Sequence, residues 1–248
     1  MPWYNPAMDE RLVPGIRERY LKVLEKIIEA STRSGRNVGG IRLVVVTKSQ
    51  PLEIVKAAIT AGATMLGENY AEEAVSKISA FRDSSVEWHM IGHVQTRKAD
   101  LVPGNFSLMH SLDSLKLAGR LNRICNETNR KLPVLLEVNV SGEESKFGFP
   151  GWDEGHWTEL VPLFEQIIAF PGLNICGLMS MPPFFADPEE VRPYFRRLRD
   201  LQMYLVERLP QTSWSELSMG TSGDFQVAIE EGATIVRVGQ EILGPRPG

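Results

Sequence analysis

The stretch Ile41-Arg-Leu-Val-Val-Val-Thr-Lys48-Ser-Gln-Pro-Leu-Glu-Ile-Val-Lys-Ala-Ala-Ile59 joins an apolar run, a polar break with one lysine and an amphipathic segment. Residues 43–46 are apolar and rich in β-branched side chains, which is typical of a strand buried on both faces in a parallel sheet. Pro51 suits the first turn of a helix, with Ser49 as its cap. The pattern therefore places Lys48 at the carboxyl end of a buried strand, directly before a helix.

The position of Lys48 allows two interpretations. Ligands bind at the carboxyl ends of the strands in strand–helix folds. A lysine that apolar neighbours partly desolvate there can have a lowered pKa and act as an amine nucleophile that forms a Schiff base. Most lysines are exposed, however, so a solvated loop lysine is the alternative on this segment alone.

The same alternation of strand-like and helix-like segments continues along the chain. Strands are expected at residues 42–47, 64–67, 86–91, 106–110, 133–140, 173–179, 214–218 and 234–238. Helices are expected at residues 51–61, 70–80, 95–100, 113–127, 156–169, 188–208 and 222–231. Eight strands with helices between them predict a single α/β domain, a (β/α)8 barrel of the TIM type, rather than an open sheet.

The segment before the first strand is expected to add one helix to the barrel. Residues 1–14 predict an irregular arm, while apolar residues recur at helical spacing from about Asp9. That helix ends in a turn-rich segment. We therefore expect one domain over residues 1–248, with the arm and helix in 1–40 and the barrel in 41–246.

A short internal repeat supports the alternation. The segment Ala58-Ile-Thr-Ala-Gly62-Ala-Thr recurs as Ala228-Ile-Glu-Glu-Gly232-Ala-Thr. In both copies the glycine is expected to end a helix in the left-handed conformation before a strand begins. The chain thus uses one kind of helix-to-strand corner twice, and because no wider repeat is present a solenoid is not expected.

Composition limits the classes of function. The 248 residues are 43% hydrophobic and 23% charged, with a formal net charge of −4, and lysines and arginines are scattered, so nucleic-acid binding is not expected. No signal peptide and no membrane-length apolar run is visible, and the isolated Cys125 and Cys176 suggest reduced packing residues. These features predict a cytoplasmic protein without a membrane partner. No long apolar stripe is left over once the barrel is built, so we expect a monomer.

A Gly/Ser-rich turn, Leu217-Ser-Met-Gly-Thr-Ser-Gly-Asp-Phe225, leads from the seventh strand into a helix. Glycines let the backbone approach an anion, and amides at a helix start favour phosphate. Gly239 follows the eighth strand, and TIM barrels often bind phosphate between the loops after strands seven and eight. The two loops predict a phosphate site; the alternative is an ordinary turn in which Ser222 caps the helix.

Arg237 stands inside the apolar strand segment Thr234-Ile-Val-Arg-Val-Gly. An arginine that faces the inside of a barrel needs a partner, because an unpaired buried charge is very costly. The partner is either a ligand or a carboxylate of the core, Glu68 or Glu137.

Other common sites lack their signatures. His89 and His93 would share one face of a helix, but a strand is expected to end between them and no third ligand has a matching spacing, so zinc is not expected. The sequence has no P-loop, no Gly-x-Gly-x-x-Gly after a strand and no Gly-x-Ser-x-Gly elbow. Nucleotide binding by those routes and serine hydrolysis are therefore disfavoured.

Motifs at the predicted strand ends together resemble one known family. They are Val46-Thr-Lys48, Leu66-Gly-Glu-Asn69-Tyr-Ala-Glu-Glu, Trp88-His-Met-Ile-Gly-His93-Val-Gln95, His110-Ser-Leu-Asp113-Ser-Leu, Asn139-Val-Ser-Gly-Glu-Glu-Ser-Lys146-Phe-Gly, Gly177-Leu-Met-Ser-Met, Leu217-Ser-Met-Gly-Thr-Ser222-Gly-Asp224-Phe and Val236-Arg-Val-Gly239. In this order they are similar to the pyridoxal phosphate homeostasis proteins, which are single-domain barrels resembling the amino-terminal half of alanine racemase. The resemblance covers about residues 41–246.

The resemblance implies that the chain binds pyridoxal 5′-phosphate. Lys48 would hold the cofactor covalently as a Schiff base, and Arg237 would face the pyridine nitrogen. Asn69 and Met219 would line the surroundings of the ring. Lys146 matches a second lysine of the family near the mouth of the pocket, to which no role is assigned.

The resemblance also implies that Ser222, with backbone around Gly220 and Gly239, holds the phosphate. Four residues depart from the family pattern. The family is expected to have Met in place of Thr221, an acidic or polar residue in place of Gly223, Thr in place of Gln240 and Asn in place of Arg97. Gln240 replaces a hydroxyl that could have donated to phosphate, so contacts from the backbone are expected there instead.

A binding protein is expected rather than an enzyme. A pyridine nitrogen that faces an arginine is not expected to be protonated, which weakens the ring as an electron sink. Alanine racemase also needs a tyrosine from a second domain and a dimer, as the resemblance implies, and only a few residues follow the eighth predicted strand here. We therefore expect uptake, shielding and release of the cofactor, with dependent apoenzymes as candidate recipients. The alternatives are a racemase-like enzyme with a minimal site and non-covalent binding of another phosphate ester.

Overall fold

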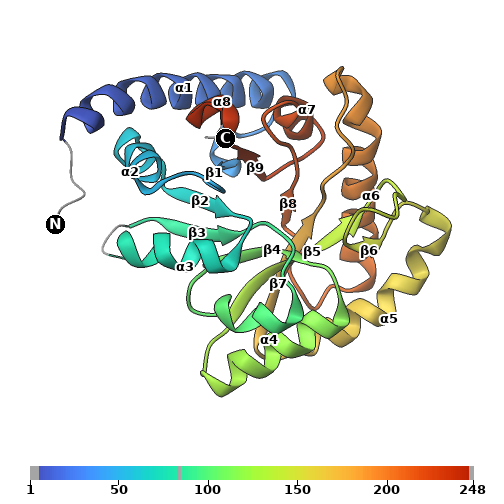
Figure 1. Cartoon of the computed structure of the whole chain (residues 1–248). Helices are drawn as coiled ribbons and strands as arrows, with labels where there is room; N and C mark the ends of the chain where they lie inside the picture. Colours follow the sequence, from blue (N-terminus) through green and yellow to red (C-terminus); the bar gives the residue numbers. More distant parts are fainter. Residues whose placement is uncertain (1–5, 83–84, 246–248) are drawn as a thin grey trace.

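The structure, a computed structural model, describes residues 6–82 and 85–245, and its main strands form a closed parallel ring (Figure 1). In ring order the strands are β1 (Arg42–Val46), β2 (Met65–Glu68), β3 (Glu87–Met90), β4 (Leu108–Leu112), β5 (Leu132–Asn139), β7 (Leu173–Met179), β8 (Glu216–Ser218) and β9 (Ile235–Val238). Pairing of β9 with β1 closes the ring. The predicted (β/α)8 barrel is therefore confirmed.

The register of β1 fixes which groups meet at one end of the barrel. Val45 pairs with Leu66 of β2 on one side and with Val238 of β9 on the other. All strands of the ring run parallel, so their carboxyl ends form one rim. Lys48, two residues after β1, consequently stands on the same rim as the loops that follow β8 and β9.

Helices cover the outside of the barrel (Figure 1). They are α2 (Leu52–Ala61), α3 (Ala71–Ala80), α4 (Leu115–Glu127), α5 (Trp157–Ile168), α6 (Arg192–Arg208), α7 (Phe225–Glu230) and α8 (Gln240–Leu243). The helix expected between β3 and β4 is a 3-10 helix, Thr96–Leu101, and a two-residue strand β6 (Phe149–Pro150) pairs with β5 outside the ring. In the part of the chain that the structure describes, no helix combines the length and apolar character needed to cross a membrane.

The apolar core has two parts. A large cluster lies between the strands and the surrounding helices. A smaller cluster of five buried side chains fills the ring itself; its members are Val44, Leu108, Leu135, Met179 and Ile235. Such layers of side chains make the interior of a TIM barrel a packed core rather than a pore, so a ligand does not enter the barrel interior.

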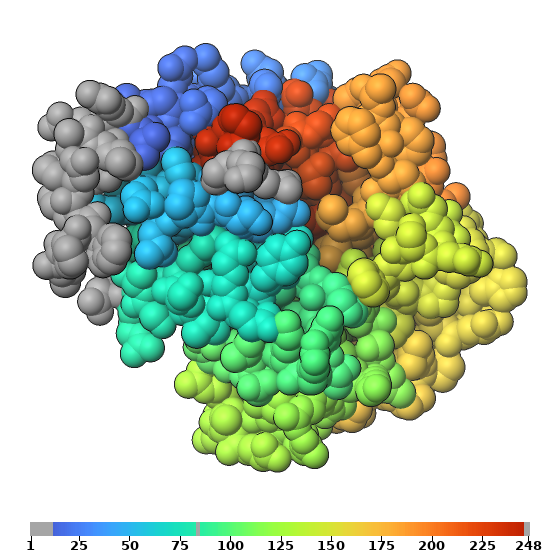
Figure 2. All heavy atoms as spheres, in the orientation of Figure 1, coloured from blue at the N-terminus to red at the C-terminus, as the bar shows by residue number. Residues whose placement is uncertain are grey.

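The amino-terminal helix α1 (Pro6–Arg33) begins earlier than expected. The irregular arm predicted for residues 1–14 is wrong from Pro6 onward, and residues 1–5 lie outside the described part. Pro14 is tolerated inside the helix, although a proline there removes a backbone hydrogen bond. The reason is packing: α1 contacts α2, α7 and α8. Figures 1 and 2 show the blue helix lying along the red carboxyl-terminal segment.

Two further local predictions are wrong. Ser49 does not cap α2: Pro51 takes the cap position without a side-chain hydrogen bond, and Ser49 has a φ of 57°, outside the extended conformation that an N-cap needs. The N–H of Ser49 instead donates to Glu73 Oε1 at 3.0 Å. The helix expected from residue 222 begins only at Phe225.

The repeated corner is confirmed. Gly62 and Gly232 have φ angles of 117° and 111°, in the left-handed region. The N–H of Ala63 donates to Ala58 O at 3.0 Å, and the N–H of Ala233 donates to Ala228 O at 2.9 Å. Both helices thus end in the same hydrogen-bonded turn before the next strand.

Candidate functional site

A hollow of about 300 Å³ lies on the rim where the loops after β1, β8 and β9 meet. Its lining includes Lys48, Asn69, Ser222, Arg237 and Gly239. A primary amine, a hydroxyl with a backbone turn, and a buried guanidinium therefore face one small space. The chain supplies these groups from positions up to 191 residues apart (239 − 48), and the parallel ring brings them together.

Two residues predicted to contact the cofactor, one near the ring and one at the phosphate, do not line this hollow. Met219 is fully buried, and its N–H donates to Ile235 O at 3.1 Å. Of the described residues, the ones that line the hollow do not include Met219 or Gly220. Lys48 itself is half-buried rather than exposed, which fits the pocket interpretation better than a solvated loop.

The turn after β8 is shaped to approach an anion. Ser222 Oγ accepts from the N–H of Gly239 at 3.3 Å, so this hydroxyl links the two loops, and α7 shows no side-chain cap. Gly220 has a φ of 91°, and a Cβ there would lie 2.6 Å from Cβ of Ala228. Only glycine fits at that point. The backbone of the two loops can therefore come close to a bound phosphate.

Arg237 is buried on β9, with 3% of its surface exposed. Its Nη2 donates to Ser180 O at 2.9 Å, and its Nη1 donates to Ser218 Oγ. Burial lowers the pKa of Arg237 to about 10, so the side chain remains a cation at neutral pH. The salt bridges among the described residues include none between Arg237 and Glu68 or Glu137, so the core ion pair is not the partner.

A buried chain of hydrogen bonds through Ser218, His110 and His89 orients Arg237. His110 Nδ1 lies 2.7 Å from Ser218 Oγ, and His89 Nδ1 lies 2.9 Å from His110 Nε2. Burial lowers the pKa of His89 to about 4 and that of His110 well below its ordinary value, so both rings are neutral at pH 7. Arg237 only donates, so Ser218 accepts from it and donates to His110, which donates to His89.

This order of donors gives a spectroscopic prediction. Both rings should carry their proton on Nε2 and remain neutral down to about pH 5, one unit above the pKa of His89. Long-range ¹⁵N–¹H correlation spectra of ring-labelled protein distinguish the two tautomers. A proton on Nδ1 of either ring would contradict the assigned direction of the chain.

Lys77 on α3 ties two rim segments together, a role that the sequence pattern did not predict. Its Nζ donates to Glu68 Oε1 at 2.9 Å and to Thr47 O at 2.8 Å, while Thr47 Oγ1 donates to Glu68 Oε1 at 2.6 Å. Thr47 and Glu68 directly precede Lys48 and Asn69 in the chain. This buried cluster consequently fixes where both pocket loops begin.

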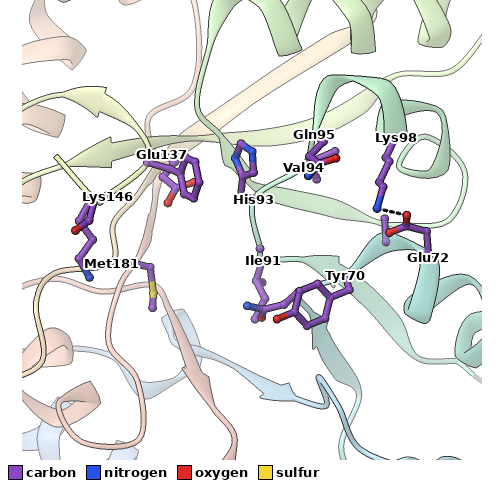
Figure 3. A pocket seen from close by; sticks show the side chains of 15 residues that line it. Tyr70, Glu72, Ile91, His93, Val94, Gln95, Lys98, Glu137, Lys146 and Met181 are labelled. Atoms are coloured by element: carbon purple, nitrogen blue, oxygen red, sulfur yellow. Dashed lines mark ion pairs between the residues drawn. The ribbon is translucent and has the colours of Figure 1, made fainter. Parts of the chain in front are cut away.

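A second hollow, of about 430 Å³, adjoins the first. The two share the walls formed by Asn69, Ile91 and Met181. Figure 3 shows Glu137, Lys146 and Met181 on one side of the second hollow, with Tyr70, Gln95 and Lys98 on the other. Groups from β5 and from the loop after it thus face the neighbourhood of Lys48.

Glu137 is an unusual residue for such a wall. Only 7% of its surface is exposed, and its Oε2 has no hydrogen-bond partner among the described residues. Burial, and secondarily Asp113, raises the pKa of Glu137 to about 7, although Arg237 and Lys146 act to lower it. A carboxyl that is half ionised at neutral pH therefore lines the second hollow.

Replacement of Glu137 by glutamine should change how stability depends on pH. The folded-state pKa is raised from 4.5 to about 7, so the folded chain pays to ionise this carboxyl, and the stability that the neutral form gives is lost as the pH rises through 7. The free energy of unfolding of Glu137→Gln relative to the parent should therefore increase by about 2–3 kcal/mol between pH 5 and pH 8. Urea denaturation at both pH values measures this. Glu144→Gln, at an exposed position, is the control; a difference that does not vary with pH would contradict the prediction.

The chain is similar to known proteins over most of its length. The family described as "Alanine racemase, N-terminal domain" matches residues 28–247. The pyridoxal phosphate homeostasis protein of Aquifex aeolicus is 41% identical over 92% of this chain and 97% of its own length. The structure of PipY from Synechococcus elongatus PCC7942 with pyridoxal phosphate bound superposes with a TM-score of 0.78 at 31% identity, over 92% of this chain and all of that one.

Alanine racemase shares the fold more distantly. The enzyme from Bartonella henselae superposes with a TM-score of 0.66 at 17% identity, over 95% of this chain but 61% of its own. At that level of identity the similarity shows the barrel fold alone. The pyridoxal phosphate homeostasis proteins of Aquifex aeolicus and Vibrio alginolyticus are 41% and 37% identical to this chain, over 92% and 93% of its length. The chain therefore belongs to the pyridoxal phosphate homeostasis protein family.

Proposed function

We propose that this protein binds pyridoxal 5′-phosphate reversibly through a covalent bond to Lys48, shields its reactive aldehyde from other amines, and releases it. One observation carries the proposal: an amine, an anion-binding turn and a buried cation line a single hollow of about 300 Å³. A homologue of nearly the same length has been solved with pyridoxal phosphate bound, which supports the identity of the ligand.

Each lining residue has a distinct task in this proposal. The cofactor supplies an aldehyde that condenses with a primary amine, and Lys48 is the amine in the hollow. The hydroxyl of Ser222 and the backbone around Gly220 and Gly239 hold the phosphate. Arg237 faces the pyridine nitrogen.

Asn69 lies beside the ring in this arrangement. Met219 is fully buried, so its contribution is to support the loop from behind.

The orientation of Arg237 favours a carrier over an enzyme. Its guanidinium is held by hydrogen bonds to Ser180 and Ser218. It can donate a hydrogen bond to a pyridine nitrogen, but it does not transfer its proton to that nitrogen at neutral pH. An unprotonated ring withdraws electrons weakly, which disfavours carbanion chemistry. We therefore propose a monomeric cytoplasmic carrier without robust turnover, with pyridoxal phosphate-dependent apoenzymes as candidate recipients.

Reduction with borohydride tests the proposal directly. The purified chain is incubated with pyridoxal phosphate, reduced, and examined by intact-mass analysis and peptide mapping; we expect one adduct, on the peptide that contains Lys48. The absence of any adduct would overturn covalent binding and favour a non-covalent phosphate-ester site. Incorporation of solvent deuterium at Cα of alanine or serine at enzymatic rates would instead overturn the carrier assignment and favour a racemase-like enzyme.

A further inference from the structure

The second hollow contains a group that the proposed function does not use. Glu137 projects from β5 into it with Oε2 buried and without a hydrogen-bond partner among the described residues. A buried acceptor without a partner is costly. In its ionised form this carboxyl only accepts, so a ligand that satisfies the ionised form must carry N–H or O–H donors.

A cation lines the same hollow without neutralising Glu137. The charge of Lys146 is near enough to lower the pKa of Glu137, but the salt bridges of the described residues do not include this pair. Lys146 Nζ reaches Pro182 O at 3.5 Å, a long contact. Figure 3 shows both side chains on the same side of the hollow. One space therefore offers a negative and a positive group that are not bonded to each other.

The lysine, glutamate and histidine side chains that remain on the wall already have partners. Lys98 forms an ion pair with Glu72, and His93 Nδ1 lies 2.6 Å from Asp113 Oδ2. Part of the remaining wall is apolar: the ring of Phe147 stacks on His93 with centroids 3.9 Å apart, and Ile91, Val94 and Met181 lie on the same wall. The neutral polar residues of the wall are Asn69, Tyr70, Gln95 and Ser145. A ligand with two opposite charges and an aliphatic part fits this combination.

We propose that the second hollow binds a small primary ammonium compound that also carries an anionic group, such as an α-amino acid, with the ammonium at Glu137 and the anionic group at Lys146. The shared walls Asn69, Ile91 and Met181 place this ligand beside the hollow of Lys48. This inference rests on the proposed function in one respect only, namely that pyridoxal phosphate occupies the neighbouring hollow of Lys48. If both proposals hold, the ammonium compound binds next to the bound pyridoxal phosphate.

Three ligands of one shape test the charges separately in the chain without pyridoxal phosphate. L-Norleucine carries both charges, pentylamine lacks the carboxylate and hexanoate lacks the amine. NMR titration should give roughly millimolar binding of L-norleucine and at least about tenfold weaker binding of the other two, because each loses one charged contact. Equal binding of all three, or no binding of L-norleucine at tens of millimolar, would overturn the proposal without the use of any variant.

Two variants assign the contacts. Glu137→Gln should weaken L-norleucine and pentylamine about tenfold but leave hexanoate unchanged, whereas Lys146→Met should weaken L-norleucine and hexanoate but leave pentylamine unchanged. Lys98→Met is the matched control, since Lys98 lines the same hollow but is paired with Glu72. Unchanged binding of L-norleucine by Glu137→Gln would refute the site.

The borohydride adduct on the parent chain is measured in parallel. An adduct without L-norleucine binding removes this inference alone. L-Norleucine binding without an adduct removes the proposed function alone.

Discussion

Replacement of Lys48 by alanine is expected to abolish covalent capture of pyridoxal phosphate completely. Among the residues that line the first hollow, Lys48 supplies the one lysine amine, and without it no carbon–nitrogen bond to the aldehyde can form there. The remaining contacts, from Ser222, Gly239 and Arg237, would still hold the phosphate and the ring. We expect the affinity to fall on the order of 100-fold rather than vanish.

Two measurements check this result. The absorbance band of the Schiff base should disappear in Lys48→Ala, and borohydride reduction should give no mass increase. Lys116→Ala, which removes an exposed lysine of α4, should keep both signals. If Lys48→Ala were labelled to the same extent at another single lysine, the capturing amine would have been misassigned.

Replacement of Lys77 by methionine is expected to destabilise the fold by about 3–5 kcal/mol. Glu68 is fully buried, and Lys77 supplies its cationic partner. Burial already raises the pKa of Glu68 despite the hydrogen bonds from Thr47 and Lys77, so loss of Lys77 leaves a carboxyl that is costly to ionise and short of one donor. Urea denaturation at pH 7 measures the change.

A double variant separates the lost charge pair from lost packing. Lys77→Met combined with Glu68→Gln removes both charges, so most of the stability should return. Glu73→Gln should have a small effect, because Glu73 is one-third exposed. If the double variant were as unstable as Lys77→Met alone, the cost would lie in packing rather than in the unpaired carboxyl.

The barrel could be predicted because its signals are local. The apolar run at 43–46 and the later strands each stand between polar residues, and the glycine corners at Gly62 and Gly232 are set by backbone conformation within a few residues. The errors occur where distant packing decides. The helix α1 extends through Pro14 because α2, α7 and α8 support it, and no signal near Pro14 in the sequence reveals that support.

The first hollow was largely predictable and the second was not. Parallel strands end on one rim, so residues that follow them, such as Lys48 and Ser222, had to gather there. Whether Lys77 points to solvent or into the rim depends on how α3 packs. Its spacing of four residues from Glu73 is equally typical of an exposed ion pair on a helix surface. Two signals for the second hollow were available: Glu137, a charged residue in the apolar segment 134–138, and Lys146, which the resemblance placed near the mouth of the pocket.

Closure of the barrel between β1 and β9 has a consequence for biosynthesis. Lys48 is synthesised early and the loops after β8 and β9 late, and the pairing of β1 with β9 brings them to the same hollow. A nascent or truncated chain that lacks β9 therefore has no complete cavity in which to trap an aldehyde. Binding of pyridoxal phosphate would therefore report that the chain has been synthesised through β9 and that the barrel has closed.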